Sequence, residues 1–277
     1  MKKKFVILTL YLVLFQCFVV AKTPFRFVFF TDLHITNLNP GPSADLQKVI
    51  SEVNATSGLD FVLVGGDIAN FGDTISLRMA KTALSTLKIP YYIVPGNHDF
   101  QWNVGVGPKN FVKVFGDDKF AFMHKGYLFA GFATAPKEKG LNGYIQPADI
   151  AWLKSQLEKA GGKTPSFIIT HYPLLPGDVD NGKELTDMLK GFDVKAVLNG
   201  HYHRNTVLNF DGIPGIVNRT VMQKKDAPAA YTIYTVDDQI HVAEKRIGEP
   251  EEIWAELPLE KSLKHNIYII SEHFSTK

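Results

Sequence analysis

Five short motifs carry the histidine, aspartate and asparagine side chains that could do chemistry. In chain order they are Asp32-Leu33-His34, Gly66-Asp67, Gly96-Asn97-His98-Asp99, His171-Tyr172-Pro173 and Gly200-His201-Tyr202-His203. Carboxylate oxygens, an amide oxygen and imidazole nitrogens are the ligands that divalent metal ions take in mixed oxygen and nitrogen sites. A hydroxide bound to such ions attacks phosphoesters at neutral pH. The residue types therefore favour a metal centre suited to phosphoester cleavage.

Short apolar runs precede most of these motifs and predict buried strands, because they are rich in β-branched and aromatic residues. The runs cover residues 25–30, 61–64, 91–94, 167–170 and 196–198. Ligands of open α/β sheets bind beyond the carboxyl ends of the strands. We therefore expect the five motifs to meet at one rim of the sheets.

Helical patterns alternate with these strands. One predicted helix starts near residue 42 and a second spans about residues 147–160, each with an apolar stripe at helical spacing. In the last third, strand patterns pair around tight-turn signals, at 206–210 with 213–217 and at 231–236 with 240–243. We expect these strands to close a second sheet. The expected fold class is α/β, with two facing sheets and helices outside them.

The first residues indicate export. Residues 1–21 combine a basic start, an apolar stretch and a small residue, Ala21, at a cleavage position, as in a signal peptide. The apolar stretch is shorter than the ~20 residues that a membrane-spanning helix needs. A periplasmic or secreted protein without a stable membrane span is therefore expected. Cys17, the only cysteine, leaves lipid anchoring as a minority alternative.

Charge argues against nucleic acid as the main partner. The full chain has a formal net charge of +2, and removing the three lysines of residues 1–21 with no acidic residue brings it to −1. A mature chain that is not basic lacks the general electrostatic attraction for a polyanion. Without Cys17 it also has no thiol that could act as a ligand or nucleophile.

The ordered set of motifs resembles the calcineurin-like metallophosphoesterase superfamily. That family has an Asp-x-His, a Gly-Asp, a Gly-Asn-His followed by an acid, a single His and a Gly-His-x-His, and all five occur here between Asp32 and His203. The resemblance implies a four-layer αββα sandwich of two facing mixed sheets flanked by helices. We assign this domain to residues 22–250 and treat residues 251–277 as a C-terminal extension.

The resemblance also implies a site for two divalent metal ions, such as Mn, Fe or Zn. One ion would be bound by Asp32, His34 and His203, and the other by Asn97, His171 and His201. Asp67 would bridge the two ions through its carboxylate. In the family, a hydroxide between the ions attacks the phosphorus atom.

His98 would face the substrate instead of a metal. The resemblance implies that it stabilises the transition state or protonates the leaving oxygen, with Asp99 orienting it as a general acid. The alternative is an imidazole held in an ordinary buried hydrogen bond.

Differences from known branches narrow the assignment. Purple acid phosphatases have a tyrosine ligand three residues after the bridging aspartate, where this chain has Asn70. The motifs also differ from the Gly-Asp-x-x-Asp-Arg-Gly of the protein Ser/Thr phosphatases. The chain is most similar to the bacterial class III cyclic nucleotide phosphodiesterase and glycerophosphodiesterase group.

The expected function is that of an exported hydrolase of small phosphodiesters or phosphomonoesters. Two alternatives remain open. A non-catalytic scaffold of the same fold would present its surface to a protein partner. A metal-dependent nuclease would need a local basic patch, for which the candidates are Lys109, Lys113, Lys119 and Lys125.

Overall fold

The computed structural model describes residues 23–100, 109–135, 142–225, 227–259 and 269–270. The expected signal peptide and Cys17 lie outside these residues. Among the described residues, no helix has both the length and the apolar character needed to cross a membrane.

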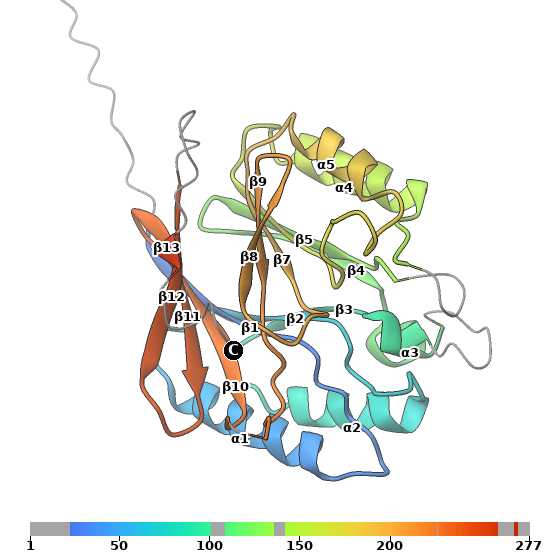
Figure 1. Ribbon diagram of the computed structural model, residues 1–277, viewed down its shortest axis with the longest axis vertical. Helices are drawn as coiled ribbons and strands as arrows, with labels where there is room; N and C mark the ends of the chain where they lie inside the picture. Colours follow the sequence, from blue (N-terminus) through green and yellow to red (C-terminus); the bar gives the residue numbers. More distant parts are fainter. Residues whose placement is uncertain (1–22, 101–108, 136–141, 226, 260–268, 271–277) are drawn as a thin grey trace, which may run out of the picture.

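Two β-sheets face one another at the centre of the molecule (Figure 1). The first has seven strands in the order β13-β12-β11-β10-β1-β2-β3, and the second has six in the order β4-β5-β6-β7-β9-β8. The strands are β1 (Phe25–Phe30), β2 (Phe61–Gly65), β3 (Tyr91–Val94), β4 (Lys119–His124), β5 (Tyr127–Phe132), β6 (Ser166–Ile169), β7 (Val194–Asn199), β8 (Thr206–Phe210), β9 (Ile213–Val217), β10 (Ala230–Val236), β11 (Gln239–Arg246), β12 (Glu251–Pro258) and β13 (Ile269–Ile270).

Helices cover the outer face of each sheet. Those of the described residues are α1 (Gly41–Ala55), α2 (Thr74–Leu84), the 3₁₀ turn η1 (Asn97–Phe100), α3 (Lys109–Phe115), α4 (Pro147–Lys159) and α5 (Gly182–Leu189). Figure 1 shows α1 and α2 on the outer face of the first sheet and α4 and α5 on that of the second. The four-layer αββα sandwich that the sequence predicts is confirmed.

The packing of strand β1 explains why its sequence is apolar apart from Arg26. Val28 and Phe30 pack toward α1 and α2, whereas Phe27 and Phe29 pack into the core between the sheets. In that core the rings of Phe27 and Phe129 meet edge to face with centroids 5.3 Å apart. A strand covered on both faces must be apolar on both, which explains a continuous run instead of an alternating one.

The parallel parts of the sheets place the motifs. Strands β1, β2 and β3 are mutually parallel, as are β5, β6 and β7. The strands within each set therefore end at the same edge of their sheet. The motifs follow the ends of β1, β2, β3, β6 and β7.

The hairpins of the last third belong to different sheets, which corrects the prediction that they close the second sheet together. Strands β8 and β9 join the second sheet, but β10 pairs antiparallel with β1, and β11 follows it in the first sheet. Turn signals specify which neighbours pair and carry no information about the sheet they join. Strand β12, in the segment that the sequence assigns to an extension, continues the first sheet beyond β11.

Candidate metal centre

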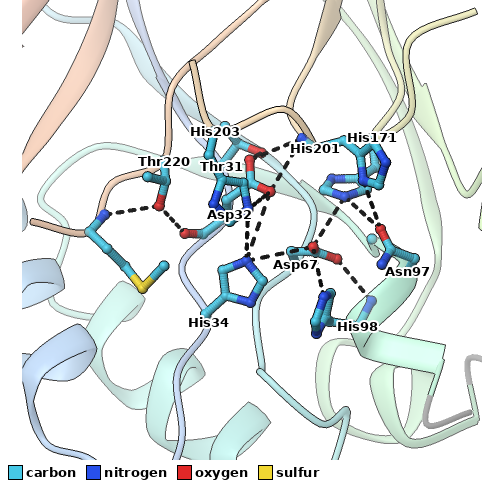
Figure 2. A network of polar contacts seen from close by, with 12 residues as sticks. Thr31, Asp32, His34, Asp67, Asn97, His98, His171, His201, His203 and Thr220 are labelled. Atoms are coloured by element: carbon cyan, nitrogen blue, oxygen red, sulfur yellow. Dashed lines mark hydrogen bonds and ion pairs between the residues drawn. The ribbon is translucent and has the colours of Figure 1, made fainter. Parts of the chain in front are cut away.

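Loops after five strands bring the seven predicted ligand residues to one place (Figure 2). The residues and the strands they follow are Asp32 and His34 (β1), Asp67 (β2), Asn97 (β3), His171 (β6), and His201 and His203 (β7). The convergence that strand ends predict is therefore present. Five of the seven are buried, and His201 and His203 are half-buried.

One group of side chains surrounds a point between the first and last motifs. Asp32, His34, Asp67 and His203 each offer an atom, and these atoms all lie within 4.8 Å of one another. His203 Nε2 is 3.1 Å from Asp32 Oδ1 and also 3.1 Å from His34 Nε2. Nitrogens and carboxylate oxygens that face one another at these distances form a site for a cation.

A second group lies on the other side of Asp67. Asn97 Oδ1 is 3.0 Å from His171 Nε2 and 3.2 Å from His201 Nδ1. Asp67 Oδ2 is 3.3 Å from His171 Nε2 and 3.7 Å from His34 Nε2. Asp67 is thus adjacent to both groups, which is the position of a bridging carboxylate.

Burial and neighbouring charges shift the pKa values of several residues of the site in opposite directions. Burial alone would raise the pKa of Asp67, but His171, His98 and His34 outweigh it and hold that pKa below its usual value. Burial likewise opposes the charge of His171, yet Asp67 raises the pKa of this imidazole to about 9. Burial lowers the pKa of His34 and of His201 to about 4, so both rings are neutral at pH 7 and have a lone pair for a metal.

The backbone around the ligands is held in an unusual conformation. Asp32, His34, Asp67, His201 and His203 have φ between 46° and 71°, in the left-handed region. Residues with a Cβ rarely adopt it, and such strain persists where the surrounding structure imposes it. Five ligand residues of this kind indicate a site whose geometry is built at a cost to stability.

Two glycines permit the close approach of these loops. A Cβ on Gly96 would collide with Oδ1 and the backbone nitrogen of Asp67. A Cβ on Gly200 would collide with Thr31 Oγ1 and lie 2.6 Å from Asp32 Oδ2. The glycines of the Gly-Asn-His and Gly-His-x-His motifs are therefore required by packing against two carboxylate loops.

The His98 side chain lies beside both groups and is 33% exposed. Its Nδ1 is 2.8 Å from the carbonyl oxygen of Asn70, so Nδ1 carries the proton of this hydrogen bond. Its Nε2 points into the site, 3.9 Å from Asp67 Oδ2. The sequence motifs do not reveal the Asn70 contact, because it is made by a backbone atom.

Asp99 contacts the loops on either side of the site, and its role in orienting the His98 ring stays a prediction. Its buried carboxylate accepts hydrogen bonds from the N–H groups of Ile68 (3.0 Å), Ala69 (2.8 Å) and Gly96 (2.8 Å). Asp99 therefore joins the loop of Asp67 to the loop of Asn97. Burial, with Asp67 nearby, raises the pKa of Asp99 to about 7.

The residues present fit divalent metal ions. Two buried carboxylates, one amide oxygen and four imidazoles are a mixed oxygen and nitrogen set that first-row ions accept. The buried Nδ1 of His34 has no hydrogen-bond partner among the described residues.

A family model for calcineurin-like phosphoesterases matches residues 25–205, more than half of the 277-residue chain. The chain belongs to the calcineurin-like phosphoesterase family.

Two relatives show which phosphoesterases this chain is similar to. It is 29% identical to the glycerophosphodiester phosphodiesterase GpdQ of Enterobacter lignolyticus over 189 residues, which are 61% of this chain and 65% of that protein. It is 26% identical to a probable GpdQ of Arcobacter nitrofigilis over 226 residues, 76% of each chain. The matched region thus spans slightly less than two thirds of the first relative.

A solved structure shares the fold of the phosphoesterase. The dimetal phosphatase from Danio rerio superposes with a TM-score of 0.65 and 13% identity, covering 86% of this chain and 99% of that one. At this identity the likeness concerns the fold alone. The family that the motifs predict is confirmed.

Residues outside the motifs also hold the phosphoesterase site together. Thr220 Oγ1 donates to the carbonyl oxygen of Asp32 over 2.6 Å, and Thr31 Oγ1 donates to Asp32 Oδ2 over 2.8 Å (Figure 2). Asn199 Nδ2 donates to the carbonyl oxygens of Thr170 and Tyr172 and so joins the loops of His171 and His201. Thr31 and Asn199 each stand beside a motif, so sequence patterns could have suggested these two residues but not Thr220.

Proposed function

We propose that this phosphoesterase hydrolyses small phosphodiesters or phosphomonoesters with two divalent ions. The position of Asp67 is the observation that carries the proposal, because its Oδ2 lies within 4 Å of the imidazole nitrogens of His34, His98 and His171. A single carboxylate between two ligand groups supports two ions that share it.

The ligand sets follow from the two groups of side chains. Asp32, His34 and His203 would hold one ion, and Asn97, His171 and His201 the other, with Asp67 common to both. Bound divalent ions would supply positive charge for the phosphoryl oxygens and lower the pKa of a water molecule at the centre. Asn97 provides its oxygen without a negative charge, which favours the approach of an anionic phosphate.

His98 would act on the leaving group. The Asn70 carbonyl oxygen accepts a hydrogen bond from Nδ1–H and fixes the ring, so Nε2 is the atom that faces the substrate. The backbone N–H of His98 donates to Asp67 Oδ1 over 2.9 Å, which fixes the position of His98 relative to the shared carboxylate. In this position Nε2 can donate a hydrogen bond or a proton to the departing oxygen.

Asp99 would act through the loops and not on the substrate. Its three accepted hydrogen bonds hold the residues after Asp67 against those before Asn97. We therefore propose it as a positioning residue for the shared carboxylate and for His98.

The names of the relatives support a small phosphodiester as the substrate, since two of them are described as glycerophosphodiester phosphodiesterases. The nuclease alternative has less support from the basic residues. Lys119 pairs with Asp149, and Lys125 lies 3.3 Å from Asp60. These two lysines are therefore not available as an unpaired basic surface for a polyanion.

A substrate panel tests the proposal. Metal-free protein would be reconstituted separately with Mn, Zn, Fe or Co and assayed on chromogenic phosphomonoesters, chromogenic phosphodiesters, glycerophosphodiesters and a DNA duplex. Turnover of small esters supports the proposal, and the ratio of diester to monoester rates defines the class. No turnover with any ion would support the scaffold alternative, whereas preferred cleavage of DNA with a steep salt dependence would support a nuclease.

Export is a separate part of the proposal and rests on the apolar segment of residues 1–21. Mass spectrometry of the protein from its native host would find a chain that begins after Ala21. A mature chain that begins with a modified Cys17 would favour the lipid-anchored alternative, and an uncleaved cytoplasmic chain would contradict export.

A further inference from the structure

A buried ionic network lies behind the loop that carries His203 and connects the two sheets. Glu244 is on β11 of the first sheet, whereas Arg219 follows β9 of the second. They are 3% and 6% exposed. Arg219 Nη1 donates to Glu244 Oε1 over 2.9 Å, and Arg246 Nε donates to the same oxygen over 2.7 Å. Apolar residues of similar volume often stabilise a fold as well as a buried ion pair does, so the directional contacts of this network call for another explanation.

Asn205 attaches the His203 loop to this network. It lies two residues beyond His203, immediately before β8. Its Nδ2 donates to Glu244 Oε2, and its Oδ1 accepts the N–H of Arg219 over 3.0 Å. Because both ends of the amide are engaged, the hydrogen bonds set the direction of the side chain as well as its position.

The same network reaches Asp32 from behind. Arg219 Nε donates to the carbonyl oxygen of Thr220 over 3.3 Å, and Thr220 Oγ1 donates to the carbonyl oxygen of Asp32. Lys224, in the same segment, donates to the carbonyl oxygen of His203. The segment from Arg219 to Lys224 therefore holds the backbones of both Asp32 and His203.

The His203 loop needs such support. His203 has φ of 55°, a left-handed conformation that is strained for a residue with a Cβ. Nevertheless its Nε2 must stay 3.1 Å from Asp32 Oδ1 for the two to share an ion. Hydrogen bonds that fix a ligand's loop raise metal affinity because the ligand loses less freedom on binding.

We propose that Asn205, held by Glu244 and Arg219, is a positioning residue for the ion that Asp32, His34 and His203 would bind. The inference rests on the proposed function, since it presupposes that ion. The second ion should depend on Asn205 less, because two of its three ligands, Asn97 and His171, lie outside the loop of residues 200–205, and only His201 shares that loop with His203.

Metal binding by Asn205→Ala tests this inference. Asn54→Ala is a matched control, because Asn54 also uses both ends of its amide, with Thr86 O and Lys88 N each at 2.8 Å, but on the α1 side of the molecule. Metal-free protein would be titrated with Mn²⁺ by equilibrium dialysis. We expect one of the two dissociation constants of Asn205→Ala to rise about 10- to 100-fold while the other changes by less than about threefold. Asn54→Ala should keep both constants.

A double variant identifies the affected ion. His203→Ala removes the ligand itself, so adding Asn205→Ala to it should cause no further loss of affinity at that site. Glu244→Gln replaces one of the two acceptor oxygens by an amide nitrogen and removes the charge shared by Arg219 and Arg246, so it should weaken the same ion and serves if Asn205→Ala does not fold. Unchanged constants in both Asn205→Ala and Glu244→Gln, or equal weakening of both ions, would overturn the inference.

The wild-type titration separates this inference from the proposed function. Two bound ions without turnover of any ester contradict the function but leave the positioning role testable through affinity. Fewer than two bound ions contradict both.

Discussion

Asp67 Oδ2 lies 3.3 Å from His171 Nε2, and both side chains are buried at the centre of the site. Without metal this contact is an ion pair, because Asp67 raises the pKa of His171 to about 9. A metal ion that takes the Nε2 atom must therefore displace a proton. Metal binding and protonation compete for the same nitrogen.

Metal affinity should depend on pH in a defined window. Below the pKa of His171, about 9, the metal-free site holds a proton on this imidazole. The apparent affinity should therefore rise about tenfold per pH unit up to about pH 9 and then level off. Titration of metal into weakly buffered protein at pH 7.5 should release about one proton per protein molecule at the His171 site. No proton release would contradict the protonated His171.

The unfolding free energy of the metal-free protein should also depend on the protonation of His171. The folded-state pKa of His171 is above its unfolded value, so its stabilising effect is complete below pH 6.5 and is lost as pH rises through about 9. Denaturant titrations at several pH values should show this fall in metal-free protein. The metal-loaded protein should lack it, because its His171 is already deprotonated.

Loss of the His98 side chain should separate catalysis from metal binding. His98→Ala should lower kcat by about a hundredfold or more, because Nε2 no longer assists the leaving oxygen. Metal content should stay unchanged, since the proposed ligand sets do not include His98. His241→Ala is the control: His241 lies on β11 and pairs with Glu256 at 2.7 Å, and its loss should leave kcat unchanged. Full activity of His98→Ala on every ester tried would show that the assignment is wrong.

The sequence predicts where the candidate ligands meet because each lies within four residues of a strand end. Apolar runs reveal where buried strands stop, and the end of β1 at Phe30 places Asp32 at the rim. The contacts that hold the ligand residues in place are much harder to predict from the sequence. Thr220 contacts Asp32 across 188 residues of chain, and Asn70 contacts His98 through a carbonyl group that every residue possesses.

In the fold as well, local sequence predicts where strands lie, whereas the pairing of strands depends on contacts between residues far apart in the sequence. The spans 25–30 and 91–94 coincide with β1 and β3, since strand formation follows the local apolar pattern. The partnership of β10 with β1 instead depends on packing such as that of Phe27 on Tyr234, whose stacked rings have centroids 4.7 Å apart. The sequence does not predict helix α2, although Asp73 caps it by accepting hydrogen bonds from the N–H groups of Ile75 and Ser76.

Gly96→Ala should damage the centre through packing alone. The added Cβ would collide with the Asp67 carboxylate, so the two loops must separate. We expect a loss of about 1–3 kcal/mol in unfolding free energy and a lower metal content. Gly191→Ala is the control, because its Cβ would meet only Met188 O at an ordinary 3.5 Å. A Gly96→Ala protein with two bound ions and normal stability would contradict the close approach of the loops.

Asp67→Asn tests the shared carboxylate and the His171 ion pair together. Asparagine has nearly the same shape but no charge, so two cations no longer share a negative ligand and the bound metal should fall from two ions to one or none. His171 also loses the main cause of its raised pKa, while the burial that opposes its charge remains. The metal-free variant should therefore lose the fall in unfolding free energy between pH 6.5 and 9 that the wild type shows. If that fall persisted in Asp67→Asn, another carboxylate would have to hold the proton on His171, and Asp32 is the candidate because it also raises the pKa of His171.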